Sequence, residues 1–139
     1  AEWVAQEFNV NELVIMKSNV FHLDTIFTPV INKDNELAAM IACTALMEKD
    51  SIINLKSFAK RLSVELVEVD PEDSIGTVDQ LGEFAVNCCP LPGYLIGPTR
   101  FRSLKVNQLL KELDVMHITV PTTQFRLSGG AVHCLTNEL

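Results

Sequence analysis

The chain has 139 residues and a mass of 15.4 kDa, which is enough for one modest domain with a core and too little for two. Hydrophobic residues make up 47% and charged residues 21%, which excludes a disordered chain. The net charge of -7, with the Lys and Arg residues scattered, argues against a surface that binds nucleic acid.

Targeting and metal-binding patterns are also missing from the sequence. No apolar run reaches the roughly 20 residues that a membrane-spanning helix needs, and the first residues do not resemble a signal peptide. We therefore predict a soluble, cytoplasmic protein that does not enter a membrane. The four cysteines lack the spacing of metal ligands, so we predict no metal site. The start at Ala1 instead of Met leads us to expect that an earlier part was removed or lies on another chain.

Three similar stretches recur along the chain, at residues 4–15, 58–69 and 109–120. Each predicts the end of a helix, a turn at Asn9, Ser63 or Asp114, and then a strand rich in β-branched residues. Equivalent positions are 54 and then 51 residues apart, which is the spacing of one supersecondary unit per repeat.

Second strands are expected between these stretches. We predict strands at residues 25–31 and 91–96, amphipathic helices at 35–48 and 103–113, and another strand beginning near Ala131. The expected fold class is therefore α/β, built from repeated helix–strand–strand modules in a single domain over residues 1–139. Modules of this size leave an apolar flank unless neighbours cover it, which favours closure of the array into a ring. A three-layer α/β sandwich is the alternative.

The last segment carries the first candidate for chemistry. Gly129 and Gly130 permit a tight turn into the start of a strand, so that Cys134 lies where the backbone can approach a ligand closely. A cysteine in such a place acts as a nucleophile if its pKa is lowered. The alternative is a buried structural thiol.

A second candidate pair lies near the amino end. Residues two apart on a strand share a face, so His22 and Asp24 would place a proton carrier beside an anion. An exposed polar pair without a catalytic role is the alternative. Asn87 occupies a comparable position before its strand and is expected to line the same cavity or to serve packing. Arg126, like Arg100 and Arg102, is a candidate clamp for a substrate carboxylate.

The two motifs together, His22-Leu-Asp-Thr25 and Gly129-Gly-Ala-Val-His-Cys-Leu-Thr136, resemble the guanidine-modifying, or pentein, superfamily. That superfamily includes arginine deiminases, dimethylarginine dimethylaminohydrolases and amidinotransferases, which share a five-module α/β propeller. The resemblance implies Cys134 as nucleophile, His22 as general acid and base, and Asp24 as the carboxylate that binds the guanidinium group. It implies no cofactor and no metal.

The resemblance also implies that this chain is only the C-terminal part of a pentein catalytic domain, a partial propeller. Five modules need about 250 residues, and the additional acid that the family carries well upstream of the histidine has no counterpart here. A second chain or a missing N-terminal segment is expected to supply the remainder.

The implied activity is that of an amidinohydrolase. It would hydrolyse arginine or methylated arginine, a small-molecule guanidine substrate, to citrulline through a covalent thiouronium intermediate. An amidinotransferase and a catalytically inactive ligand-binding or assembly module are the alternatives.

Overall fold

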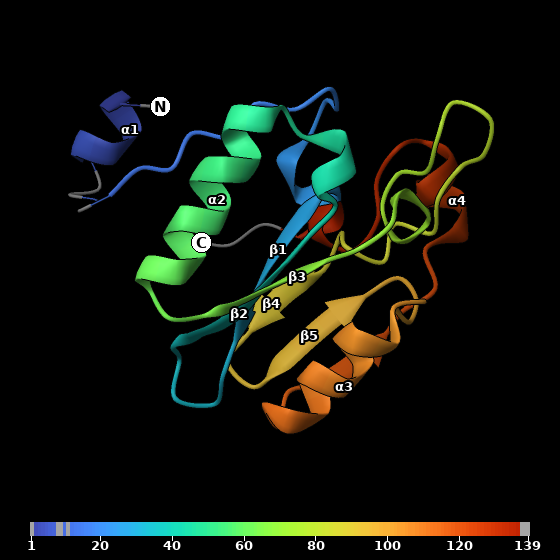
Figure 1. The fold of residues 1–139 in the computed structure, drawn as a ribbon. Helices are drawn as coiled ribbons and strands as arrows, with labels where there is room; N and C mark the ends of the chain where they lie inside the picture. The colour runs from blue at the N-terminus through green and yellow to red at the C-terminus, as the bar shows by residue number, and fades with distance from the viewer. Residues whose placement is uncertain (1, 8–9, 11, 137–139) are drawn as a thin grey trace.

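The structure is a computed structural model that describes residues 2–7, 10 and 12–136. The chain forms two small mixed sheets and several helices (Figure 1). The strands are β1 (Phe27–Ile31), β2 (Leu37–Ala42), β3 (Glu65–Glu68), β4 (Cys89–Leu91), β5 (Tyr94–Gly97) and β6 (Met116–Thr119). The α-helices are α1 (Glu2–Glu7), α2 (Lys49–Arg61), α3 (Leu104–Glu112) and α4 (Thr123–Leu127). Four 3-10 turns are η1 (Leu23–Thr25), η2 (Thr44–Leu46), η3 (Pro71–Asp73) and η4 (His133–Leu135).

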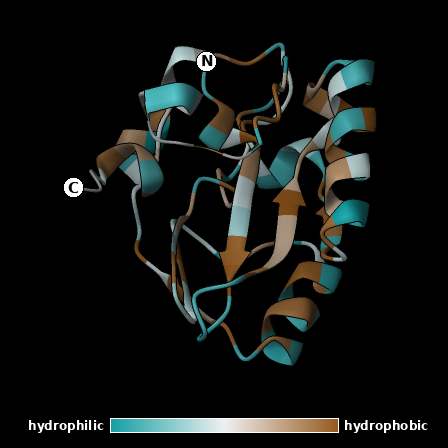
Figure 2. Cartoon of the chain, turned by 90° about the vertical axis from the view of Figure 1, so that its left-hand side faces the viewer, coloured by the Kyte–Doolittle hydropathy of each residue, from teal (hydrophilic) through white to brown (hydrophobic). Residues whose placement is uncertain are grey.

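The two sheets have the same topology. One has the order β1-β2-β3 and the other β4-β5-β6. In each, the first two strands form an antiparallel hairpin, and the third strand pairs parallel to the second. A parallel pair needs a crossover connection, which α2 provides in the first sheet and α3 in the second. Figure 2 shows these two helices along the same side of the chain, one above the other.

Two of the three helix-to-strand stretches have the arrangement expected from the sequence. Ser63 follows α2 with φ 56°, and Asp114 follows α3 with φ 52°, so each reverses the chain in the left-handed conformation before β3 or β6 begins. In the first stretch, Asn9 lies outside the described residues. Residues 12–17 form neither a helix nor a strand, so the strand expected in this stretch is wrong over these residues.

The predicted helix at residues 35–48 is wrong. Asn35 is a left-handed turn residue with φ 63°, and the chain then forms the central strand β2 and the turn η2. Four of the six β2 residues are buried, so the segment is apolar on both faces and has no strand-like alternation that the sequence could show. The helix begins only at Lys49.

Other predicted boundaries need smaller corrections. The strand expected at residues 91–96 is divided by a turn at Gly93, which has φ 75°, into β4 and β5. The strand expected from Ala131 is wrong as far as residue 136, where the chain forms η4 instead. The helix expected at residues 103–113 is confirmed as α3, with the Ser103 hydroxyl accepting a hydrogen bond from Val106 N–H as its N-cap.

The apolar core is continuous between the two sheets. It contains side chains from β1, β2 and β3 together with residues of β5, α3 and the strand entry at Val115. Strands β1 and β4 lie next to each other, which places the segments that precede them side by side. This juxtaposition positions the candidate site.

His117 on β6 gives the fold a testable pH dependence. Burial lowers the pKa of its imidazole below the ordinary value of 6.5, with a smaller contribution from Arg100, and Nε2 has no hydrogen-bond partner within the part of the chain that the structure describes. The His117 imidazole binds a proton more readily in the unfolded chain than in the folded one. Its contribution to the free energy of unfolding is therefore complete above pH 6.5 and is lost as pH falls from there toward the folded-state pKa. We expect the urea midpoint to fall less between pH 7 and 5 in His117→Gln than in the wild type. If the urea midpoint of His117→Gln fell between pH 7 and 5 by as much as that of the wild type, this assignment would be wrong. His22→Gln, at an exposed histidine, is the control.

Candidate active site

Three segments that are distant in sequence meet around the Cys134 thiol. Asp24 lies in η1 just before β1, Asn87 lies just before β4, and Cys134 lies in η4. The Cys134 Sγ atom is 3.2 Å from Asp24 Oδ2 and 3.3 Å from Asn87 Nδ2. The same Asn87 Nδ2 is 3.0 Å from Asp24 Oδ2, so the three side chains form a closed triangle of contacts.

Asn87 is the buried member of this group, with 0% of its surface exposed. Its Nδ2 also donates to the Asp24 backbone carbonyl at 3.2 Å. Its Oδ1 accepts from the backbone N–H groups of Ala131 at 2.9 Å and Cys134 at 3.4 Å, and its own carbonyl accepts from His133 N–H at 3.3 Å. The Asn87 side chain thereby holds the segment that contains Cys134 next to the segment that contains Asp24.

The Cys134 residue is exposed, unlike the other three cysteines, which are buried. Burial of the thiol group raises its pKa above the ordinary value, and Asp24 adds to this by accepting its hydrogen bond and by its negative charge. Hydrogen bonds from the Ala131 backbone and Asn87 act in the opposite direction. The thiol is therefore held protonated by its own surroundings, with a carboxylate beside it that a bound cation would neutralise.

Removing the Asp24 charge tests this electrostatic arrangement. In Asp24→Asn the pKa of the Cys134 thiol should fall, because an accepting, negatively charged neighbour is replaced by a neutral amide. We expect iodoacetamide to alkylate Cys134 several-fold faster at pH 7.5 than in the wild type, measured by peptide mass spectrometry. Asp34→Asn, an exposed carboxylate in the β1–β2 turn, is the control. An unchanged or slower rate in Asp24→Asn would contradict the assignment.

His22 is brought to the same neighbourhood but not into contact with the thiol. It is the N-cap residue of η1, not part of a strand, so the predicted shared strand face with Asp24 is wrong. The Thr25 hydroxyl closes this turn by donating to the His22 carbonyl at 2.6 Å. The imidazole is exposed and lies edge-on to Phe21, with ring centroids 4.6 Å apart. Phe21 is 95% exposed, a position that no sequence pattern indicated.

Arg126 is not part of the triangle of contacts between Asp24, Asn87 and Cys134. It lies on α4, where its guanidinium pairs with Glu83, and its buried Nε has no partner among the described residues. The two residues line a cavity of about 320 Å³ together with Pro98, Thr99 and the 121–123 turn. Its role in binding a substrate carboxylate stays a prediction.

Two neighbours of the nucleophile candidate support its position. A Cβ atom on Gly130 would lie 3.1 Å from Cys134 Cβ and 3.2 Å from Sγ, so this glycine allows η4 to fold closely onto the turn. His133 Nδ1 lies 3.1 Å from the Cys88 carbonyl and so donates to it, which fixes the ring away from the thiol.

Comparison with known proteins identifies structural relatives but not sequence relatives. No protein-family model matches the chain, and no curated protein matches it. Among solved structures, the N-terminal domain of ArgZ matches with a TM-score of 0.71 and 20% identity over 98% of this chain and 45% of that chain. ArgZ is described as an arginine dihydrolase from the ornithine–ammonia cycle in cyanobacteria, and that structure is a cysteine-to-serine mutant bound to substrate.

Two further structures agree. The ArgZ domain with an asparagine-to-serine substitution, covalently bonded to a reaction intermediate, matches with a TM-score of 0.70 and 20% identity over 96% of this chain and 44% of that one. AgrE in a ternary complex with ornithine and NAD+ matches with a TM-score of 0.66 and 21% identity over 89% of this chain and 16% of that one. The fold that these neighbours share with this chain is the one that the resemblance to the pentein superfamily predicted.

This chain shares its fold with part of the N-terminal domain of ArgZ. The resemblance inferred from the two short motifs is thereby confirmed for the fold. The chain spans 45% of the matched ArgZ domain, so it corresponds to less than half of it. Within the described part of the chain, no helix combines the length and apolar character needed to cross a bilayer.

Proposed function

We propose that this pentein-like chain carries the nucleophile, the proton carrier and one guanidinium-binding carboxylate of an amidinohydrolase. The substrate would be arginine or a methylated arginine, and the product citrulline. The observation that carries the proposal is the placement of Asp24 Oδ2 3.2 Å from Cys134 Sγ. A planar cation that binds this carboxylate necessarily brings its central carbon close to the sulfur.

The binding step would also activate the nucleophile. Without substrate, Asp24 and burial of the thiol keep the pKa of Cys134 high. A bound guanidinium would pair with Asp24 and place positive charge beside the sulfur, which favours the thiolate. The reactive form of Cys134 would therefore exist mainly in the substrate complex, which protects an exposed thiol from other electrophiles.

The chemistry then follows in two halves. When substrate binds, the Cys134 thiol would release its proton to solvent, and the thiolate attacks the guanidinium carbon, forming a C–S bond while one C–N π pair moves onto nitrogen. His22 donates its proton to a terminal nitrogen, the C–N bond breaks, and ammonia or an alkylamine leaves the thiouronium intermediate on Cys134. His22 next takes a proton from water, whose oxygen attacks the same carbon. The C–S bond then breaks and its electron pair returns to Cys134 as the thiolate, the remaining hydroxyl proton passes to solvent, and the ureido product leaves with the new oxygen.

Asn87 would have a positioning role in this scheme. Its buried amide contacts both Asp24 and Cys134, so its hydrogen-bonding groups are already used by the protein. A role in direct substrate binding, which the sequence suggested, would need one of these contacts to open. Arg126 would reach a substrate carboxylate only after leaving Glu83.

The remainder of a pentein propeller would complete the site. The matched ArgZ domain is more than twice as long as the aligned part of this chain, and the upstream acid implied by the resemblance is not among these residues. We propose that a missing segment or a second chain supplies it, with residues 1–139 forming the C-terminal part of a single catalytic domain.

A labelled-water experiment tests the reaction. The protein, with the remaining part of the domain present, is incubated with arginine or dimethylarginine in ¹⁸O-water, and citrulline is analysed by mass spectrometry. The proposal predicts citrulline with one ¹⁸O in its ureido group. Transfer of the amidino group to an added amine without citrulline would instead identify an amidinotransferase. Absence of both products would contradict the enzymatic proposal and leave a ligand-binding or assembly module.

A further inference from the structure

A cavity of about 460 Å³ gathers basic side chains on one side of this acidic protein. It is lined by Arg100 from the segment before α3, Lys111 from the last turn of α3, and His117 from β6. Among the described residues that line it there is no Asp or Glu, and Asp24, Asn87 and Cys134 are not among them either. The cavity is therefore separate from the candidate active site.

The two fixed cations of this cavity are not neutralised by the protein. Acidic residues outnumber Lys and Arg by 18 to 11, and five of the eleven basic residues form ion pairs with a carboxylate. Arg100 and Lys111 form no ion pair with any residue that the structure describes. Two unpaired cations around one cavity without an acid produce a local positive potential in a chain whose net charge is -7.

His117 can supply a third positive charge at the same place. Its ring packs against Phe101, with centroids 5.3 Å apart, and its buried Nε2 is without a hydrogen-bond partner in the described part of the chain. Burial and the nearby Arg100 charge lower the pKa of the imidazole. Cys88 Sγ also lies against Gly97, as His117 Nε2 does, but burial raises the pKa of this thiol and keeps it neutral. A bound anion would therefore favour protonation of His117.

A second cavity shows that an arginine alone does not create such a place. This cavity, of about 560 Å³, is lined by Arg102, and its other lining residues include Glu68, Asp70, Glu72 and Asp73. The carboxylates there would repel an anion. The absence of described acids is what distinguishes the cavity with Arg100 and Lys111.

We propose that the cavity formed by Arg100, Lys111 and His117 binds a small organic anion that carries a phosphate group. Two fixed cations match a dianion, and the guanidinium can bind two phosphate oxygens at once. The rest of the lining is mainly apolar and suits a short apolar body on the ligand: Phe101, Leu110, Val115 and Met116. The volume lies in the range of about 300–1,000 Å³ that is typical of small-molecule sites. This inference goes beyond the proposed function and does not depend on the reaction.

Three probes separate the chemical features of the ligand. Phenyl phosphate, inorganic phosphate and benzoate are each titrated by calorimetry at pH 7 into the preparation used for the labelled-water experiment. We expect saturable binding of phenyl phosphate with a Kd below about 1 mM, and binding of the other two at least about fivefold weaker. Benzoate that binds as tightly as phenyl phosphate would overturn the choice of a phosphate. Absence of saturable binding of phenyl phosphate would overturn the site.

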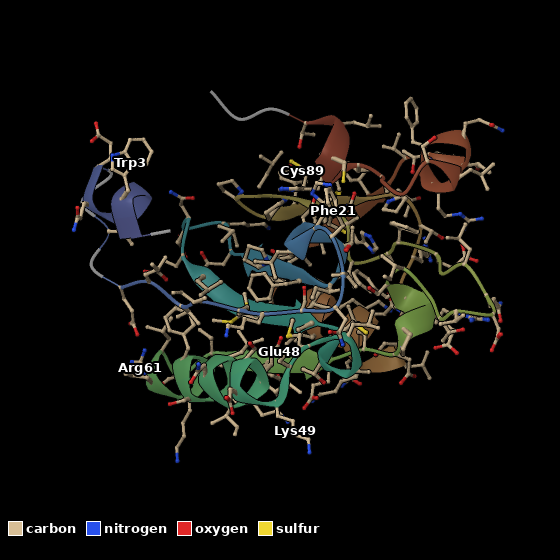
Figure 3. All side chains as sticks on the ribbon, turned by 90° about the horizontal axis from the view of Figure 1, so that it is seen from above. Trp3, Phe21, Glu48, Lys49, Arg61 and Cys89 are labelled. Carbon is tan, nitrogen blue, oxygen red and sulfur yellow. The ribbon has the colours of Figure 1, made fainter. Side chains whose placement is uncertain are left out.

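Substitutions locate the binding. Arg100→Gln and, separately, Lys111→Gln should each weaken phenyl phosphate binding about five- to tenfold, because each removes one charge-assisted contact. Arg102→Gln and Lys49→Gln are the matched controls, since both side chains are exposed and form no ion pair with a described residue. Figure 3 shows Lys49 extending away from the ribbon. Equal weakening in the controls would indicate attraction to positive charge in general and would overturn the proposal.

The histidine signals give an independent readout of the same site. The His117 ring signals are followed by NMR over a pH titration, with and without saturating phenyl phosphate. The apparent pKa of His117 should rise when the ligand is bound, because a neighbouring anion favours the imidazolium. The signals of His22 and His133 should not move on addition of the ligand. A His117 titration that the ligand does not change would contradict the proposed site.

The reaction and the anion site can fail independently. In Cys134→Ser the affinity for phenyl phosphate should equal that of the wild type, because Cys134 does not line the cavity. Weaker binding in this variant would place the anion in the candidate active site and overturn the proposal. None of these readouts measures citrulline, so failure here is distinguishable from failure of the proposed reaction.

Discussion

Replacing Cys134 by Ser is expected to reduce citrulline formation by about 10³-fold or more, because the hydroxyl remains protonated where a thiolate would form. The thiol is exposed and borders the core instead of filling it, so the free energy of unfolding should change by less than about 0.5 kcal/mol. Product formation is measured by mass spectrometry and stability by urea unfolding of the same preparation.

A buried cysteine provides the matched control for this prediction. Cys43 is 0% exposed and lies in the core, so Cys43→Ser should lower stability by about 1–2 kcal/mol while the folded fraction keeps its activity. Equal losses of activity in the two variants would show that the Cys134 effect comes from misfolding. Retention of citrulline formation in Cys134→Ser would remove Cys134 from the reaction.

Replacing Asn87 by Ala should affect stability and the site together. The change leaves the Ala131 N–H and the Asp24 carbonyl without their buried partner and frees η4 from η1. We expect a loss of about 2–4 kcal/mol in the free energy of unfolding, since each unsatisfied buried group costs about 1–3 kcal/mol. Turnover of arginine should fall at least about 100-fold, because the sulfur and the carboxylate are no longer held at contact distance.

Asn107 offers a chemically matched comparison. Its Nδ2 donates to the carbonyls of Phe101 at 2.8 Å and Ser103 at 2.9 Å, and Asn107 lies on α3, which contains none of the candidate site residues. Asn107→Ala should therefore destabilise the chain with little effect on turnover by the folded protein. If Asn87→Ala lowers stability but leaves turnover and Cys134 alkylation unchanged, the positioning role is wrong.

Local features of the sequence were sufficient for part of the fold. Ser63 and Asp114 follow apolar helical patterns and precede β-branched strands, and the left-handed turns form at those two residues. Ser103 caps α3 where the pattern begins. These features depend on residues a few positions apart, whose conformational preferences act before any long-range contact forms.

The central strand could not be predicted in the same way. Residues 37–42 have no alternation because residues on both faces of β2 are buried. Such a run is compatible with a helix or a strand until its neighbours are known.

By itself the sequence determined the types of the reactive groups: a cysteine after two glycines, a histidine and a carboxylate two residues apart, and an asparagine before a strand. Only the tertiary structure decided that Asp24, Asn87 and Cys134 touch, that His22 caps a turn, and that Arg126 pairs with Glu83. The reason is physical. The contacting side chains are 63 and 110 positions apart, and their distance is set by the packing of β1 against β4, a long-range event with no local sequence pattern.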